Sequence, residues 1–168
     1  MRRFSIMGLL LLAGLIFAAA AQSDDLLTAR VVGVTSGDSI AILETGNKLV
    51  KLRLHGIDCP EEGQPFGERA KQFTSEQCFG KIIMYRLVGI DRFDRTIATV
   101  FLEDGRELNL EILKAGYAWY YQQYVDRQDY ADAEAEARKA ETGLWGNKDP
   151  KAPWEWRQEK RKPPGPQS

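Results

Sequence analysis

The chain has 168 residues, of which 43% are hydrophobic and 28% are charged, so it fits one globular domain and excludes a large multidomain protein. Its formal net charge is −1. Proteins that bind nucleic acid through a broad basic surface usually carry a clear positive charge, because phosphate neutralisation supplies their affinity. The charge balance argues against that class, and any nucleic-acid function must come from a local site.

Residues 1–21 have the pattern of a secretion signal. Arg2 and Arg3 precede an apolar run over residues 6–17, and the four alanines that follow are the small residues a signal peptidase requires. The run is short for a membrane span of roughly 20 apolar residues. We expect a secreted or periplasmic protein, with an uncleaved membrane anchor as the alternative. Cleavage would leave 21 basic and 24 acidic residues, which makes the mature chain mildly acidic.

Three strands are expected at the start of the mature chain. Ser36-Gly37 separates the first from the second, and Thr45-Gly46-Asn47 supplies residues that tolerate the left-handed conformation of a hairpin turn. The third run alternates aliphatic and polar side chains, as a half-buried strand does. The predicted strands cover Leu26–Val34, Ser39–Leu43 and Lys48–His55.

An amphipathic helix is predicted to follow these strands. Pro65 is a favourable first helical residue, and Phe66, Ala70 and Phe73 recur at helical spacing between charged residues. Gly80 ends the segment.

Two more strands and two more helices complete the expected domain. The strands cover residues 81–90 and 96–102 around a charged turn at 91–95, and the helices cover 108–115 and 129–142. Five strands with a helix between the third and the fourth favour an α+β fold, a five-stranded OB-type β-barrel with three helices. The outer loops of such barrels commonly hold oligonucleotides or oligosaccharides.

The end of the chain, residues 148–168, is expected to be a solvated tail, because it holds five of the seven prolines. Trp145, Trp154 and Trp156 suggest that its first part is a strap laid over the domain. The basic residues 160–162 are typical of a solubilising tail, with a nucleic-acid arm as the alternative.

Five charged side chains are expected to converge at one end of the barrel. Asp38 precedes the second strand, Arg53 lies near the end of the third, Asp58 and Glu61 follow it, and Arg95 lies in the turn between the fourth and fifth strands. Each alone fits a solvated turn residue. Together they supply carboxylates for a hard cation, a base for water and cations for developing phosphate charge, which is what phosphodiester hydrolysis needs.

The stretch R-L-H-G-I-D-C-P-E from Arg53 to Glu61 closely resembles the thermonuclease (staphylococcal nuclease-like) family. The resemblance continues in Q-P-F-G at 64–67 and D-R-F-D-R at 91–95, and it covers a domain at 26–147. It implies an OB barrel with three helices and Ca²⁺-dependent cleavage of DNA and RNA to products with 3′-phosphate ends.

The resemblance also implies roles for individual residues. The matches to the calcium ligands are Asp38, Asp58 and the backbone carbonyl of Cys59. Glu61 matches the general base, and Arg53 and Arg95 match two phosphate-clamping arginines. Arginine suits that role because its planar fork binds two phosphate oxygens, whereas lysine offers a point charge.

Four further residues are candidates for substrate contact: Arg92, Phe93, Tyr121 and Tyr124. Aromatic faces stack on nucleobases. Trp119 is assigned to the core instead. We therefore expect a monomer that acts on DNA and RNA, single strands preferred, without a stable protein partner.

Two questions stay open from the sequence. Cys59 and Cys78 are the only cysteines, and an oxidising exterior permits a disulfide, with buried thiols as the alternative. The other function classes are a non-catalytic OB-type module that binds nucleic acid and a partner-binding domain of the cell envelope. A multi-histidine metal site is excluded, because His55 is the only histidine.

Overall fold

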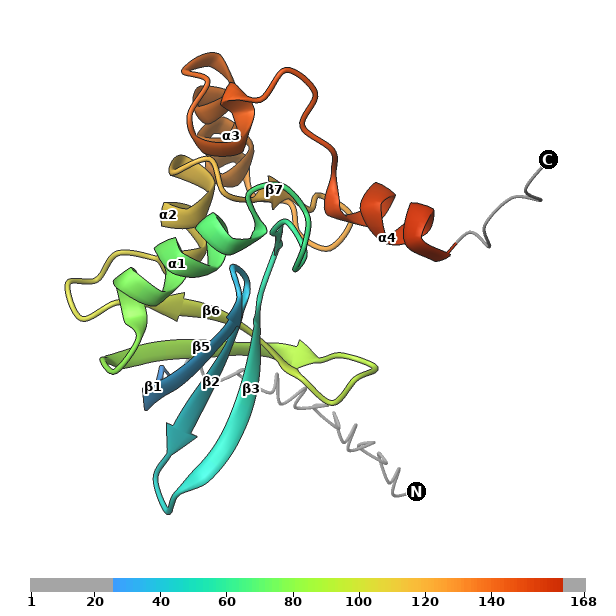
Figure 1. Ribbon diagram of the computed structural model, residues 1–168. Helices are drawn as coiled ribbons and strands as arrows, with labels where there is room; N and C mark the ends of the chain where they lie inside the picture. Colours follow the sequence, from blue (N-terminus) through green and yellow to red (C-terminus); the bar gives the residue numbers. More distant parts are fainter. Residues whose placement is uncertain (1–25, 162–168) are drawn as a thin grey trace, which may run out of the picture.

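Five strands close into a barrel in the order β1-β2-β3-β6-β5 (Figure 1). The computed structural model describes residues 26–161. Neighbouring strands are antiparallel except β3 and β6, which are parallel. The bounds of the five strands are β1 (Leu27–Ser36), β2 (Ser39–Glu44), β3 (Lys48–Leu54), β5 (Ile82–Ile90) and β6 (Thr96–Phe101). The predicted five-stranded barrel is confirmed.

The barrel forms because apolar residues alternate along its strands. In β3, Leu52 and Leu54 are buried, while Lys51 is exposed and Arg53 lies at the surface of the barrel. Side chains two residues apart share one face of a strand. The aliphatic side chains therefore fill the interior, and the polar residues of β3 face outward.

Helices gather at one end of the barrel. Figure 1 shows α1, α2 and α3 above that end, with α4 beside β7. The helix bounds are α1 (Gly67–Cys78), α2 (Leu108–Lys114), α3 (Gln128–Lys139) and α4 (Pro153–Arg161), with a 3₁₀ turn η1 at Gly143–Gly146. The first three helices agree with the predicted ones to within a few residues.

A second, two-stranded sheet was not expected from the sequence. It pairs β4 (Ile57–Asp58) with β7 (Trp119–Tyr120), with Ile57 opposite Tyr120 and Asp58 opposite Trp119. Strands of two residues are too short to show an alternating pattern. The pairing fixes the chain that carries Asp58 against the aromatic segment after α2.

Residues 153–161 of the expected C-terminal tail form the helix α4, which packs on the domain as the expected strap would and is not simply solvated. Proline lacks an N–H and has a helical φ, so Pro153 is well suited to begin this helix. The Trp154 ring centre lies 5.4 Å from that of Tyr121 and 6.4 Å from that of Trp119. In addition, Gln64 Nε2 donates a hydrogen bond of 2.7 Å to the Lys151 carbonyl. The ring contacts hold α4 against the aromatic segment at β7, and the hydrogen bond holds the chain just before α4 against the loop that follows β4.

The predicted signal at 1–21 lies outside the described residues, as does the end of the tail after residue 161. Within residues 26–161, none of the helices has the length and apolar character that a membrane crossing needs.

Candidate active site

Asp38 is held in the turn between β1 and β2. Its Oδ1 accepts hydrogen bonds from Ser36 Oγ at 2.9 Å and Ser39 Oγ at 3.1 Å, and its Oδ2 accepts one of 2.7 Å from the backbone N–H of Cys59. A Cβ at Gly37 would lie 2.8 Å from Cys59 Sγ, so only glycine lets the turn approach this closely. The turn therefore fixes Asp38 beside the loop that follows β4.

Arg53 projects from β3 between two carboxylates. Its Nη2 lies 3.2 Å from Asp38 Oδ2 and 2.9 Å from Asp58 Oδ1. Its Nη1 donates to the carbonyls of Leu54 and Ile57, at 3.0 and 2.7 Å. Burial alone would lower the pKa of Arg53, but the two carboxylates outweigh burial and raise that pKa. The guanidinium is therefore charged and fixed in place.

Asp58 is the most deeply buried carboxylate of the group, with 2% of its surface exposed. Burial raises the pKa of Asp58, and nearby Asp38 raises it further, while hydrogen bonding and charge from Arg157 and Arg53 act in the opposite direction. Burying a carboxylate without a partner costs several kcal/mol. Asp58 therefore depends on the two arginines that contact it.

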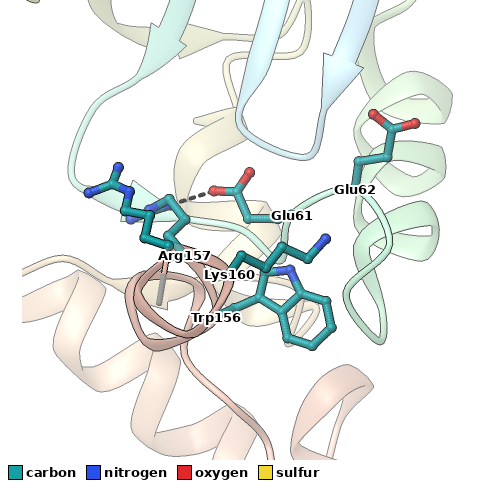
Figure 2. A pocket seen from close by; sticks show the side chains of 6 residues that line it. Glu61, Glu62, Trp156, Arg157 and Lys160 are labelled. Carbon is teal, nitrogen blue, oxygen red and sulfur yellow. Dashed lines mark hydrogen bonds and ion pairs between the residues drawn. The ribbon is translucent and has the colours of Figure 1, made fainter. Parts of the chain in front are cut away.

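Glu61 follows Asp58 in the loop before α1, and Arg157 reaches it from α4. Arg157 Nη1 lies 2.5 Å from Glu61 Oε1, and Arg157 Nη2 lies 2.8 Å from Asp58 Oδ2. Figure 2 shows the Arg157 side chain directed at the Glu61 carboxylate. The Glu61 side chain is 40% exposed, so water reaches it.

Sequence reasoning missed Arg157. Its contacts to Asp58 and Glu61 span 99 and 96 positions of the chain. The only local signal was a proline followed by W-E-W-R, which is compatible with the first turn of a helix. Nothing in that pattern shows which distant carboxylates the arginine meets.

Arg95 does not join the carboxylate cluster by direct contact. Its Nε and Nη2 each lie 2.7 Å from Asp91 Oδ2, within the turn between β5 and β6. The register pairs Arg53 with Ile97, and Arg95 lies two residues before Ile97. Arg95 therefore lies just before the part of β6 that pairs with β3 around Arg53.

Of the other two candidates in this turn, Phe93 is 65% exposed. Its ring centre lies 4.8 Å from the guanidinium carbon of Arg92 and 5.6 Å from that of Arg95. The turn therefore presents one exposed aromatic ring with two arginines close to it.

The tyrosine candidates lie beside α4. Tyr124 is 70% exposed, and its ring centre is 5.0 Å from that of Tyr121. The backbone N–H of Tyr121 donates to the Gly56 carbonyl at 2.8 Å, which ties this segment to the chain just before Asp58. Trp119 is buried, as expected.

Both cysteines are free and buried. The Cys78 thiol donates to the Thr74 carbonyl at 3.1 Å within α1. Burial raises the pKa of Cys78 to about 12, and burial together with the Asp38 charge raises the pKa of Cys59 well above its ordinary value. Both cysteines are therefore buried, protonated thiols in the structure, and they do not form the disulfide that the sequence left open.

The oxygen atoms of this cluster are of the chemical type that binds a hard cation. Carboxylate and carbonyl oxygens are the ligands that Ca²⁺ takes, and Asp38 and Asp58 supply two carboxylates next to each other. Among residues 26–161, no three His, Cys, Asp or Glu side chains are grouped as a ready metal site. Two carboxylates would therefore need backbone and water oxygens to complete the coordination.

Comparison with known proteins agrees with this arrangement. A model of the staphylococcal nuclease homologue family matches residues 51–147. An uncharacterized endonuclease of Haemophilus influenzae is 34% identical over 160 residues, which are 95% of this chain and 88% of that protein. An uncharacterized endonuclease of Escherichia coli O157:H7 is 35% identical over 131 residues, 78% of this chain and 85% of the relative.

A plant protein is also similar. Staphylococcal-like nuclease CAN1 of Arabidopsis thaliana is 36% identical over 114 residues, 68% of this chain, and the match spans 35% of the plant protein. The family match covers more than half of the chain and includes most of β3, the loop with Asp58 and Glu61, and the turn with Arg95. The chain therefore belongs to the staphylococcal nuclease family and is a nuclease.

Proposed function

We propose that the protein is a secreted or periplasmic, Ca²⁺-dependent nuclease that cleaves DNA and RNA, with a preference for single strands, to products with 3′-phosphate ends. One observation carries the proposal: Arg53 bridges Asp38 and Asp58 next to the partly exposed Glu61. The family resemblance supports Ca²⁺ and the product ends. The signal-like pattern of residues 1–21 supports the location.

Asp38, Asp58 and the backbone carbonyl of Cys59 would hold the cation. A bound Ca²⁺ would supply positive charge next to the phosphate that is attacked. The Cys59 side chain is not part of this set, because its raised pKa keeps the thiol protonated and only a thiolate is a good ligand. The two aspartates are preorganised for the task, since each is already fixed by several hydrogen bonds.

Glu61 would accept the proton of the attacking water. A general base must reach water and the reacting phosphate at once, and Glu61 is both solvent-accessible and adjacent to the cation ligands. Arg53 and Arg95 would bind phosphate oxygens. The Nε and Nη2 groups of Arg95 both contact Asp91, and the same two groups can donate hydrogen bonds to a phosphate.

The preference for single strands rests on exposed rings. Phe93 and Tyr124 are the most exposed aromatic residues described, and unpaired bases present the faces on which such rings stack. The acidic overall charge disfavours tight binding to long duplexes. One chain supplies the whole cluster, which supports a monomer without a stable protein partner.

The test is degradation of a single-stranded DNA by the purified protein with Ca²⁺, repeated with excess chelator. Degradation that the chelator abolishes supports the proposal. DNA that is retarded in a gel but stays intact would indicate a non-catalytic nucleic-acid-binding module. Absence of any interaction would favour a partner-binding envelope domain.

A further inference from the structure

Helix α4 lies outside residues 51–147, which the family model matches, yet it forms most of an open pocket beside Glu61. The pocket has a volume of about 290 Å³. Its lining, most of which Figure 2 labels, consists of Glu61, Glu62, Trp156, Arg157, Lys160 and Arg161. The helix therefore builds a surface that continues directly from the proposed general base.

Three of these residues form a basic face on α4. Arg157, Lys160 and Arg161 are spaced i, i+3 and i+4, so they lie on one side of the helix. A helix rises about 1.5 Å per residue, so the face extends about 6 Å along the axis. Lys160 and Arg161 therefore lie about one turn beyond Arg157, on either side of the line along the helix that passes through it.

The outer part of the basic face is not neutralised by nearby carboxylates. Glu159 of the same helix binds Lys151 instead, at 2.6 Å, and in Figure 2 the Glu62 carboxylate points away from Lys160. Lys160 Nζ lies 5.0 Å from the Trp156 ring centre, which limits its freedom. Within residues 26–161, no carboxylate pairs with Lys160 or Arg161. Both cations are exposed and available to an anion.

The face is also held firmly against the domain. Trp154 packs on Tyr121, and the Lys151 carbonyl accepts a hydrogen bond from Gln64. Arg157 joins the helix to Asp58 and Glu61. A ligand on this face therefore has a fixed direction relative to the carboxylate cluster.

We propose that this basic face of α4 is a second phosphate-binding site, which holds the phosphates next to the scissile one in a single-stranded substrate. The inference rests on the proposed nuclease function and extends it to a segment beyond the family match. In a chain with net charge −1, affinity for a polyanion has to come from such a local cluster of cations.

The test compares two variants that each lose two positive charges. K160Q/R161Q alters the basic face, and the control K139Q/K148Q removes exposed lysines from the end of α3 and from the loop after η1. The readout is the Kd for a fluorescent 12-nucleotide oligothymidylate, measured in chelator so that no turnover occurs, at several salt concentrations.

We expect K160Q/R161Q to weaken binding roughly tenfold or more at 0.1 M salt. The slope of log Kd against log salt should fall by about 0.7 for each phosphate that the variant no longer neutralises. The control should bind like the wild type. K160R/R161K, which keeps both charges, should retain wild-type affinity. Weaker binding by K160Q/R161Q is then due to the lost charges and not to a change in folding.

Equal affinities of K160Q/R161Q and its control would overturn the inference, as would an absence of binding by the wild type. Tighter binding by K160Q/R161Q would also overturn it, because α4 would then obstruct the substrate. Cleavage of the same oligonucleotide by the wild type with Ca²⁺ tests the proposed function separately.

Discussion

Arg157 Nη1 lies 2.5 Å from Glu61 Oε1, so the last described helix reaches the carboxylate that we propose as general base. The same guanidinium holds Asp58 at 2.8 Å. Asp58 and Glu61, which follow β3, thus form a single charged network with one residue of α4. Truncation before α4 would remove part of the site and not merely a tail.

The first prediction concerns Arg157→Met. The variant leaves the buried carboxylate of Asp58 with Arg53 as its remaining cation, and we expect a loss of about 1–3 kcal/mol in the free energy of unfolding. Urea denaturation of the variant and the wild type measures this difference in the free energy of unfolding. Lys114→Met is the control, because it breaks an exposed pair with Glu111 that is worth about 0.5 kcal/mol or less. Equal losses in the two variants would show that Arg157 behaves as a surface residue.

The second prediction concerns Arg95→Lys. Lysine keeps the charge but loses the two-point geometry, so turnover at saturating Ca²⁺ should fall by about tenfold or more with little change in stability. Arg92→Lys should have a much smaller effect on turnover, because Arg92 lies over the Phe93 ring, where lysine keeps the positive charge. If steady-state kinetics give the same small effect for both, Arg95 has no role in the reaction.

The third prediction concerns the thiols. The thiolate is the reactive form, and the raised pKa values of Cys59 and Cys78 leave almost none of it at about pH 8. A thiol-reactive disulfide reagent should therefore label the native protein very slowly at that pH and should label two thiols after unfolding in urea without reductant. Zero thiols in the unfolded, unreduced sample would mean that the two cysteines form a disulfide in that preparation.

The fourth prediction concerns Asp38→Asn. The amide oxygen can still accept hydrogen bonds from Ser36 and Ser39, but the charge for the cation is lost. The Ca²⁺ concentration for half-maximal activity should rise by about tenfold or more, because affinity for Ca²⁺ depends on the number of charged ligands. Asp126→Asn, at an exposed position, should leave the calcium titration unchanged. If Asp38→Asn needs the same Ca²⁺ concentration for half-maximal activity as the wild type, Asp38 is not a ligand of the cation.

Most of the fold could be predicted from the sequence because the barrel strands and the first three helices are long enough to show periodicity. In β3, the burial of Leu52 and Leu54 follows the alternation. The two-residue strands β4 and β7 were missed, since they are shorter than one repeat of any pattern. Helix α4 was missed because a proline-rich composition is typical of a solvated tail, whereas Pro153 begins a helix.

The candidate site was predicted in part. Asp38, Asp58 and Arg53 are in contact, and Glu61 joins them through Arg157. Their convergence follows from the order of strands and loops in the barrel. The contacts of α4 depend on tertiary packing of Trp154 and Arg157, and no local sequence pattern encodes the partner of a side chain that lies 99 positions away.

The most direct test of the proposed mechanism is the turnover of Glu61→Gln on single-stranded DNA at saturating Ca²⁺, with Glu103→Gln from the exposed turn after β6 as control. A positioned general base contributes about 10²–10⁴-fold, so Glu61→Gln should lose about two orders of magnitude or more in turnover while it stays folded. The control should cleave at the wild-type rate. Near-wild-type turnover by folded Glu61→Gln would contradict the assignment of the base and, with it, the proposed mechanism.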